Sequence, residues 1–262
     1  MFGAIIGDII GSPYAFGSGK TKHFPLFLPE CRPTDDSVMT IAVGCACVEA
    51  NCHNEWEFKS TLAEKMRQLG RMYPDAGYGG MFYRWLMEED AGAYGSYSNG
   101  SAMRVSPVAW AAESLEEALR LAKWSAEITH DHPQGIRGAQ AVAAAIYLAR
   151  TGSDQSQIQR YIEENFYDLD FTLDAIRPGY GHDMTCEGSV PQAIRCFLEA
   201  EDYEDAVRNA VSLGGDGDTQ AAIAGAIAEA FFGIPQVILE EAMEHVDDTL
   251  MEYIELYTGE LY

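Results

Sequence analysis

The sequence is poor in basic residues. It has 17 Lys and Arg against 41 Asp and Glu, and its formal net charge is -24 over 262 residues. Such a surface repels the phosphate backbone of nucleic acids and anionic bilayers, so neither is expected as a main partner. An acidic surface can also serve solubility alone, without any role in binding. An anionic ligand would need local positive charge, from metal ions or from backbone N–H groups directed at it.

The sequence also lacks long apolar runs, a secretion signal and closely paired cysteines. No 18 uncharged apolar residues follow one another, so no transmembrane helix is expected. The apolar start, MFGAIIGDIIG, has no basic segment and is interrupted by Asp8. The six cysteines form no CxxC motif, which indicates reduced thiols in a cytoplasmic protein.

Alternating strand patterns of useful length are absent, and helical periodicity dominates. Apolar residues recur at i, i+3, i+4 and i+7 in six segments, which predict helices over 36–50, 114–130, 134–150, 190–200, 203–215 and 219–233. Ser114 with Glu117 predicts a capping box, and Asp202 predicts a second N-cap. Gly152, Gly214 and Gly233 stand where helices should end. We therefore expect an all-α fold with more than ten helices, in one domain over residues 1–262.

Two acidic segments could hold metal ions. In PTDDS, residues 33–37, Thr34, Asp35 and Asp36 open a predicted helix, where capping is the simpler explanation. In LGGDGDTQ, residues 213–220, capping would account for Asp218 and Thr219 but not for Asp216 between three glycines. Carboxylate and hydroxyl oxygens suit Mg²⁺, Mn²⁺ or Ca²⁺, and the two segments together could hold two divalent ions.

The second segment also resembles the nucleophile loop of haloacid-dehalogenase-like phosphatases. That chemistry requires the loop to follow a buried β-strand. The preceding residues, RNAVSLGG, predict the end of a helix instead. The phosphatase alternative is therefore disfavoured.

Two further segments could bind a ligand's phosphate groups. GSYSNGSAMRVSP, residues 95–107, places glycines and hydroxyl side chains before a helix, as a phosphate-binding loop requires, although ordinary turns share this composition. THDHPQGIRGA, residues 129–139, carries His130 and His132 between two predicted helices. These histidines could bind a phosphate or could cap a helix end.

Five motifs, in order, resemble those of the ADP-ribosylglycohydrolases. They are GAIIGDIIGSPYAF, PTDDS, SNGSAMRVSPV, THDHPQGIRGA and LGGDGDTQAAIAGAIAEAFFGIP, and they cover essentially the whole chain. The resemblance implies an orthogonally packed multi-helical domain with two Mg²⁺ or Mn²⁺ ions, an ADP-ribosylated protein or peptide as partner, and a monomer. The metal ligands that it implies are Thr34, Asp35, Asp36, Asp216, Asp218 and Thr219, with Asp35 and Asp36 also close to the chemistry.

The resemblance further implies where ADP-ribose would bind. The loop over residues 95–100 would wrap the diphosphate, Ser96 and Tyr97 being its first contacts, and the loops at 20–33 and 180–188 would face the leaving group. His130 would lie beside the distal part of ADP-ribose, with His132 nearby. The substrate-binding residues implied in this way are Gly95, Ser96, Tyr97, Ser98, Asn99, Gly100, His130 and His132.

Ala15 departs from the family pattern, in which a glutamate usually follows the first motif. An alanine can neither transfer a proton nor bind a cation, and losing a general acid–base group commonly costs about 10²–10⁴-fold in rate. The alanine could be an engineered change, the mark of a natural ADP-ribose-binding pseudoenzyme, or compensated by another carboxylate such as Asp8. Because the other motifs are intact, a deliberate change in an otherwise active hydrolase is favoured.

The sequence therefore predicts a metal-dependent hydrolase that removes ADP-ribose from a protein side chain, of reduced activity because of Ala15. An ADP-ribose-binding pseudoenzyme without turnover is the alternative. A purely structural acidic protein is the third possibility, and Mg²⁺ would not raise its melting temperature.

Overall fold

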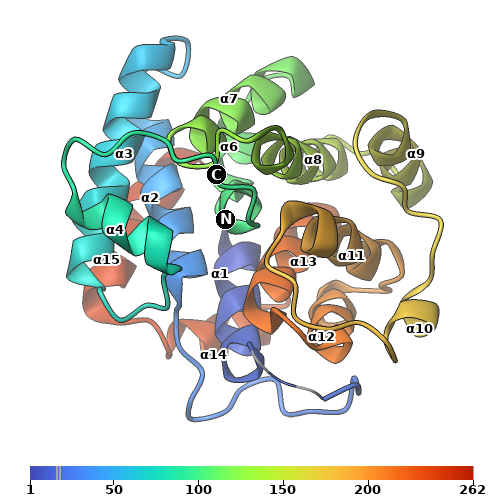
Figure 1. Cartoon of the computed structure of the whole chain (residues 1–262). Helices are drawn as coiled ribbons and strands as arrows, with labels where there is room; N and C mark the ends of the chain where they lie inside the picture. The colour runs from blue at the N-terminus through green and yellow to red at the C-terminus, as the bar shows by residue number, and fades with distance from the viewer. Residues whose placement is uncertain (16, 18, 262) are drawn as a thin grey trace.

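The computed structural model describes residues 1–15, 17 and 19–261, and nearly all regular structure in them is helical (Figure 1). One short 3-10 helix, η1 (Ser12–Tyr14), follows the first helix. The α-helices are α1 (Phe2–Gly11), α2 (Asp35–Glu49), α3 (Glu55–Met72), α4 (Gly80–Met87), α5 (Gly100–Met103), α6 (Ser106–Ala111), α7 (Leu115–Glu127), α8 (Pro133–Arg150), α9 (Gln155–Asn165), α10 (Leu173–Ile176), α11 (Cys186–Leu198), α12 (Tyr203–Leu213), α13 (Gly217–Phe232), α14 (Gln236–Met243) and α15 (Asp248–Leu261).

The all-α prediction is confirmed, and most predicted helix ends agree within two residues. Gly214 and Gly233 end α12 and α13 with positive φ of 66° and 75°, which glycine adopts without strain. The helix predicted from residue 190 begins earlier, at Cys186, because Thr185 caps it by accepting a bond from the Gly188 N–H at 2.9 Å.

The predicted capping box at Ser114 is only half present. Ser114 accepts from the Glu117 N–H at 3.1 Å, but the Glu117 carboxylate accepts from the Glu113 N–H instead of the Ser114 N–H. The side chain of Asp202 caps α12 as expected, accepting from the Asp205 N–H at 2.8 Å.

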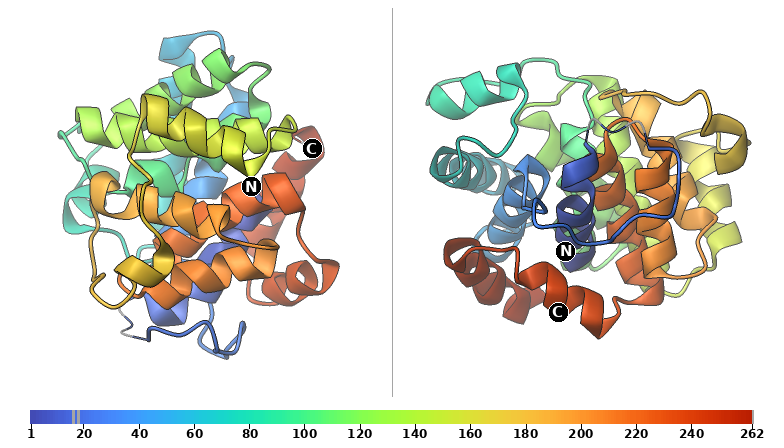
Figure 2. Two further views of the ribbon diagram at one scale, coloured as in Figure 1. Left: turned by 90° about the vertical axis from the view of Figure 1, so that its right-hand side faces the viewer. Right: turned by 90° about the horizontal axis from the view of Figure 1, so that it is seen from below.

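Helix α1 lies between α2 and α13, and glycines let it approach α13 very closely (Figure 2). A Cβ at Gly3, Gly7 or Gly11 would lie 2.3 Å from Gly225 O, 2.1 Å from Ala221 O and 2.5 Å from the Asp218 Cα, respectively. These glycines recur every four residues and so share one face of the helix. The close contact brings the C-terminal half of α1 to the N-terminus of α13.

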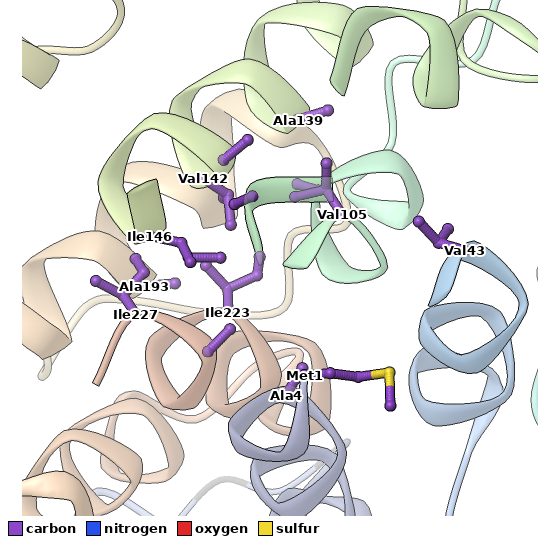
Figure 3. Packing of buried hydrophobic residues seen from close by; sticks show 14 of the residues in the cluster. Met1, Ala4, Val43, Val105, Ala139, Val142, Ile146, Ala193, Ile223 and Ile227 are labelled. Atoms are coloured by element: carbon purple, nitrogen blue, oxygen red, sulfur yellow. The ribbon is translucent and has the colours of Figure 1, made fainter. Parts of the chain in front are cut away.

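The apolar core continues outward from this pair of helices. Figure 3 shows Ile223 and Ile227 of α13 facing Val142 and Ile146 of α8, with Ala193 of α11 beside them; all are buried. Many of the contacting residues are alanines, which let the helices pack at short distances. The core thus fixes α13, whose first turn carries Asp218 and Thr219.

All six cysteines are free, as the sequence predicted. None of the described helices has the length and apolar character that a membrane-spanning segment requires. That residues 1–262 form a single domain stays a prediction.

Candidate functional site

Asp8 of α1 fixes the start of α2. Its carboxylate is fully buried and accepts bonds from the Thr34 N–H at 2.8 Å, the Thr34 hydroxyl at 2.7 Å, the Ser37 N–H at 3.0 Å and the Ser37 hydroxyl. Hydrogen bonds of this kind offset the cost of burying a carboxylate. Asp8 therefore joins α1 to the first turn of α2.

Asp8, Asp36 and Asp218 form an acidic cluster at the junction of α1, α2 and α13. One oxygen of each lies within 4.8 Å of the others. Asp36 accepts from the Thr219 hydroxyl at 3.2 Å, yet its Oδ1 is buried without a hydrogen-bond partner. A buried carboxylate oxygen without a donor is costly, and a cation would satisfy it. The hard oxygen donors of this cluster fit a divalent metal ion.

Burial raises the pKa of five aspartates in this region, and repulsion between carboxylates adds to it in all of them except Asp8. Burial is the larger cause: it raises the pKa of Asp36 and of Asp218 well above the ordinary value, and Asp8 adds repulsion to both. The pKa of Asp35 rises to about 7, again through burial and then the charge of Asp8, and that of Asp216 rises through burial. The site therefore holds more negative charge than its protein surroundings compensate.

Asp216 connects the acidic cluster to the glycine- and serine-rich loop. It stands at the N-cap of α13 but makes no side-chain capping bond; its Oδ2 accepts from the Asn99 side chain at 2.7 Å. Thr34 does cap α2, accepting from the Asp36 N–H at 3.3 Å. Capping thus accounts for Thr34 but not for Asp216. The residues before Asp216 form helix α12, whereas a phosphatase nucleophile loop requires a β-strand there.

The loop over residues 95–100 lies between the acidic cluster and the start of α8. Gly95, with φ of 68°, donates its N–H to Asp131, and Asn99 N–H donates to Met184 O at 2.7 Å. Tyr97 is 54% exposed and lies 5.4 Å from the ring of His132, centroid to centroid. Ser96 and Ser98 are half-buried, and their hydroxyls are 3.0 Å apart.

The two histidines after α7 have different roles. His132 is exposed and caps α8, its Nδ1 accepting from the Gln134 N–H at 3.2 Å, so the capping alternative holds for this residue. His130 is 2% exposed and both ring nitrogens bond within the protein, to the Thr129 hydroxyl at 2.7 Å and the Ser98 hydroxyl at 2.9 Å. Its nitrogens are therefore not free for a ligand, although the ring lies directly behind the loop.

Ala15 lies beside the same acidic turn. It follows η1 and is half-buried. A Cβ at Gly217 would lie 2.9 Å from Tyr14 O, and the Gly215 N–H donates to Gly17 O at 3.4 Å, so Tyr14 and Gly17 both lie close to the turn that carries Asp216.

The two loops expected to face the leaving group meet at this turn. Lys20 Nζ donates to Tyr180 O at 2.6 Å and to Leu213 O. Segments at residues 20 and 180 are thus joined next to Gly214.

The fold and the site define an all-α protein in which an acidic, cation-seeking cluster adjoins a glycine- and serine-rich loop. The family model for ADP-ribosylglycohydrolase matches residues 1–261, and the chain belongs to this family.

Individual relatives agree. The chain is 29% identical to ADP-ribosylhydrolase ARH3 of Mus musculus over 313 residues, covering 90% of this chain and 84% of the relative. It is 22% identical to ADP-ribosylarginine hydrolase Tri1 of Pseudomonas putida (strain GB-1), with 89% and 70% covered. A solved structure titled "ADP-ribosylglycohydrolase-related protein complex" matches with a TM-score of 0.66, 20% identity and coverage of 100% and 96%, which shows the shared fold.

Sequence reasoning missed part of the site. Asp8 appeared only as a substitute for the absent glutamate, whereas it is a member of the acidic cluster. The signal was present: a single carboxylate interrupts an otherwise apolar helix, and buried carboxylates are rare unless they have partners. Arg104 and Thr129 were quoted in motifs but given no role.

Proposed function

We propose that the chain is a metal-dependent hydrolase that removes ADP-ribose from a modified protein side chain, and that Ala15 lowers its activity. Family membership supports the coarse reaction, the hydrolytic release of ADP-ribose from modified substrates. The observation that carries the proposal is the hydrogen bond between Asn99 and Asp216, because it places a cation-seeking cluster next to a loop suited to phosphate groups.

Thr34, Asp35, Asp36, Asp216, Asp218 and Thr219 would hold two Mg²⁺ or Mn²⁺ ions. Such ions would neutralise the carboxylates, hold ribose hydroxyls and polarise the attacking water. Asp8 is best regarded as an anchor, since its Oδ2 accepts three hydrogen bonds and its Oδ1 accepts a fourth from the Thr34 hydroxyl.

The protein's own contribution is to orient the substrate. The loop over residues 95–100 would hold the diphosphate, with Tyr97 and His132 at its exposed edge. The loops joined by Lys20 would surround the leaving group. Cleavage breaks the bond between the anomeric carbon and the side chain while water adds to that carbon, through a transition state with oxocarbenium character.

The missing glutamate favours the second candidate, an ADP-ribose-binding protein without turnover. Asp8 is fully buried and its carboxylate accepts four hydrogen bonds from α2 and its N-cap, so it is a poor substitute for a general base at position 15. The two candidates differ in turnover, not in affinity.

The test compares this chain with the Ala15→Glu variant. We expect Ala15→Glu to release ADP-ribose from arginine- or serine-linked peptides about 10²–10⁴-fold faster in the presence of Mg²⁺. EDTA should abolish release by the variant. Asp168→Asn, on an exposed loop, is the matched control and should leave both rates unchanged.

The outcomes separate the candidates. Metal-dependent release by the parent chain, slower than by Ala15→Glu, supports the hydrolase. ADP-ribose binding by the parent chain without any release would replace it with the binding protein.

A further inference from the structure

Arg104 is buried without an ionic partner. Its side chain is 0% exposed and, among the described residues, its guanidinium bonds to no carboxylate. It donates instead to Gly100 O at 2.8 Å, Ser125 O at 3.1 Å and the Thr129 hydroxyl at 2.9 Å. Burial lowers the pKa of Arg104 to about 10, which leaves it charged near neutral pH. A buried charge normally has an ionic partner, so the burial of the Arg104 guanidinium without one needs an explanation.

The Thr129 hydroxyl sets a direction of hydrogen bonding. Thr129 is 0% exposed, and its hydroxyl contacts Arg104 Nη2 and His130 Nδ1. A guanidinium only donates, so the hydroxyl must accept from Arg104. Its own hydrogen then goes to His130 Nδ1, because leaving it unbonded in the interior would cost free energy. The ring of His130 is thereby held with its proton on Nε2.

The same direction continues into the loop. With this tautomer, His130 Nε2–H donates to the Ser98 hydroxyl at 2.9 Å. The Ser98 and Ser96 hydroxyls are 3.0 Å apart, and either can donate to the other. Ser96 Oγ also accepts from the Ser98 N–H at 3.3 Å. Whichever serine donates to the other, one of the two half-buried hydroxyls has its hydrogen left to donate.

Gly100 makes room for this chain of hydrogen bonds. A Cβ at Gly100 would lie 3.0 Å from His130 Nε2. A side chain at residue 100 would therefore crowd the imidazole where it contacts the loop.

We propose that Arg104 is a positioning residue: through Thr129 it fixes the Nε2–H tautomer of His130 and orders the Ser98 and Ser96 hydroxyls, so that the loop presents a donor to an anionic phosphate group. The proposal rests on the proposed function, which assigns the diphosphate to this loop. If His130 instead carried its proton on Nδ1 and donated it to Thr129, Nε2 would accept from Ser98 and Ser98 from Ser96. The serines would then present lone pairs to the ligand and repel an anion.

The tautomer is measured by ¹⁵N NMR on protein labelled in its six histidines, with His130→Asn used to assign the His130 signals. We expect a neutral ring protonated on Nε2 in the parent chain at about pH 7. An Nδ1–H ring or a protonated ring would overturn the proposal. This measurement needs no ligand and no variant of Arg104, whose loss could unfold the protein.

The consequence for binding is measured with ADP-ribose by calorimetry in the presence of Mg²⁺. Thr129→Val keeps the shape of the side chain and Arg104 but removes the hydroxyl. The substitution should weaken ADP-ribose binding about fivefold, the equivalent of one hydrogen bond. The His130 ring should then no longer be held with its proton on Nε2. Thr129→Ser keeps the hydroxyl and should restore both.

Failure of this inference differs from failure of the proposed function. Unchanged affinity and tautomer in Thr129→Val, or Nδ1–H in a chain that binds ADP-ribose, contradicts the ordered hydrogen bonds alone. Absence of ADP-ribose binding by the parent chain contradicts the proposed function itself, whichever tautomer is present.

Discussion

The acidic cluster and the hydrogen-bond chain behind the loop at residues 95–100 are both buried, and the Asn99–Asp216 bond joins them. The cluster concentrates carboxylates of like charge and leaves Asp36 Oδ1 without a partner. The hydrogen-bond chain begins at the buried guanidinium of Arg104 and continues through neutral groups. Each hydroxyl and ring nitrogen in it has a partner. The cluster lacks positive charge, whereas the network behind the loop lacks acceptors: Arg104 Nε and one serine hydroxyl hydrogen are left without one.

This difference explains how a chain of net charge -24 could bind a diphosphate. In the proposed function, two divalent cations would neutralise the four aspartates of the predicted metal ligands, and the loop would direct a donor at the anion. Three changes test whether the two networks behave as differently as their contacts indicate.

The largest effect is expected from Asp218→Asn, which keeps size but removes a charge from the cluster. Affinity for Mn²⁺ should fall by at least about 100-fold, since changes even to residues outside the ligand set cost about 10–100-fold. The metal-free protein should become more stable, because Asp216 and Asp8 repel Asp218.

Calorimetric titration with Mn²⁺ and thermal unfolding in EDTA measure the two effects, with Asp168→Asn as the control. Unchanged affinity, or a metal-free variant less stable than the parent, would argue against a repulsive metal site. The tautomer of His130 should not change.

An intermediate effect is expected from Gly7→Ala. The new Cβ would lie 2.1 Å from Ala221 O, so α1 and α13 must separate. Overpacking of this kind costs about 1–3 kcal/mol of unfolding free energy. Because α1 carries Asp8, metal affinity should fall as well.

Chemical denaturation measures the loss. Gly92→Ala is the matched control, since a Cβ at Gly92 meets nothing within 4 Å. Equal stability of the two variants would show that the close contact of α1 with α13 is dispensable.

The smallest effect is the pH dependence of the metal-free protein. The pKa of Asp35 is raised to about 7 in the folded chain, so the folded state binds more protons than the unfolded state between about pH 4 and about pH 7. The stability that Asp35 contributes is therefore greatest at low pH and is lost as the pH rises through about 7.

Melting temperatures in EDTA should thus be higher at about pH 5 than at about pH 7.5. Saturating Mg²⁺ should remove much of this difference, because it stabilises the ionised form by mass action. Asp35→Asn should flatten the metal-free profile; an identical profile would assign the effect to other groups.

Much of the fold was predictable because helix formation is local. The periodic segments, the Asp202 cap and the glycines at 214 and 233 act within a few residues, and all appear within about four residues of their predicted positions. The Ser114 box failed in part because Glu117 had a competing backbone donor at Glu113, which the sequence pattern does not distinguish.

The candidate site was only partly predictable because it depends on contacts between residues that are far apart in the sequence. Asp216 stood out because a turn does not need its charge, and the structure gives it a partner in Asn99, 117 residues away. His130 was expected to lie beside the distal part of ADP-ribose, which stays a prediction. The sequence pattern did not indicate that its two ring nitrogens bond to the Thr129 and Ser98 hydroxyls.

The sequence by itself determined the helices, their ends, the excess of negative charge and the segments rich in hydroxyl and carboxylate groups. Only the tertiary structure decided which of these groups meet. Glycines on α1 set the distance between Asp8 and Asp218, and the burial of Arg104 fixes the order of hydrogen bonds behind the loop. The physical reason is that local propensities depend on neighbours in the chain, whereas desolvation and hydrogen-bond partners depend on neighbours in space.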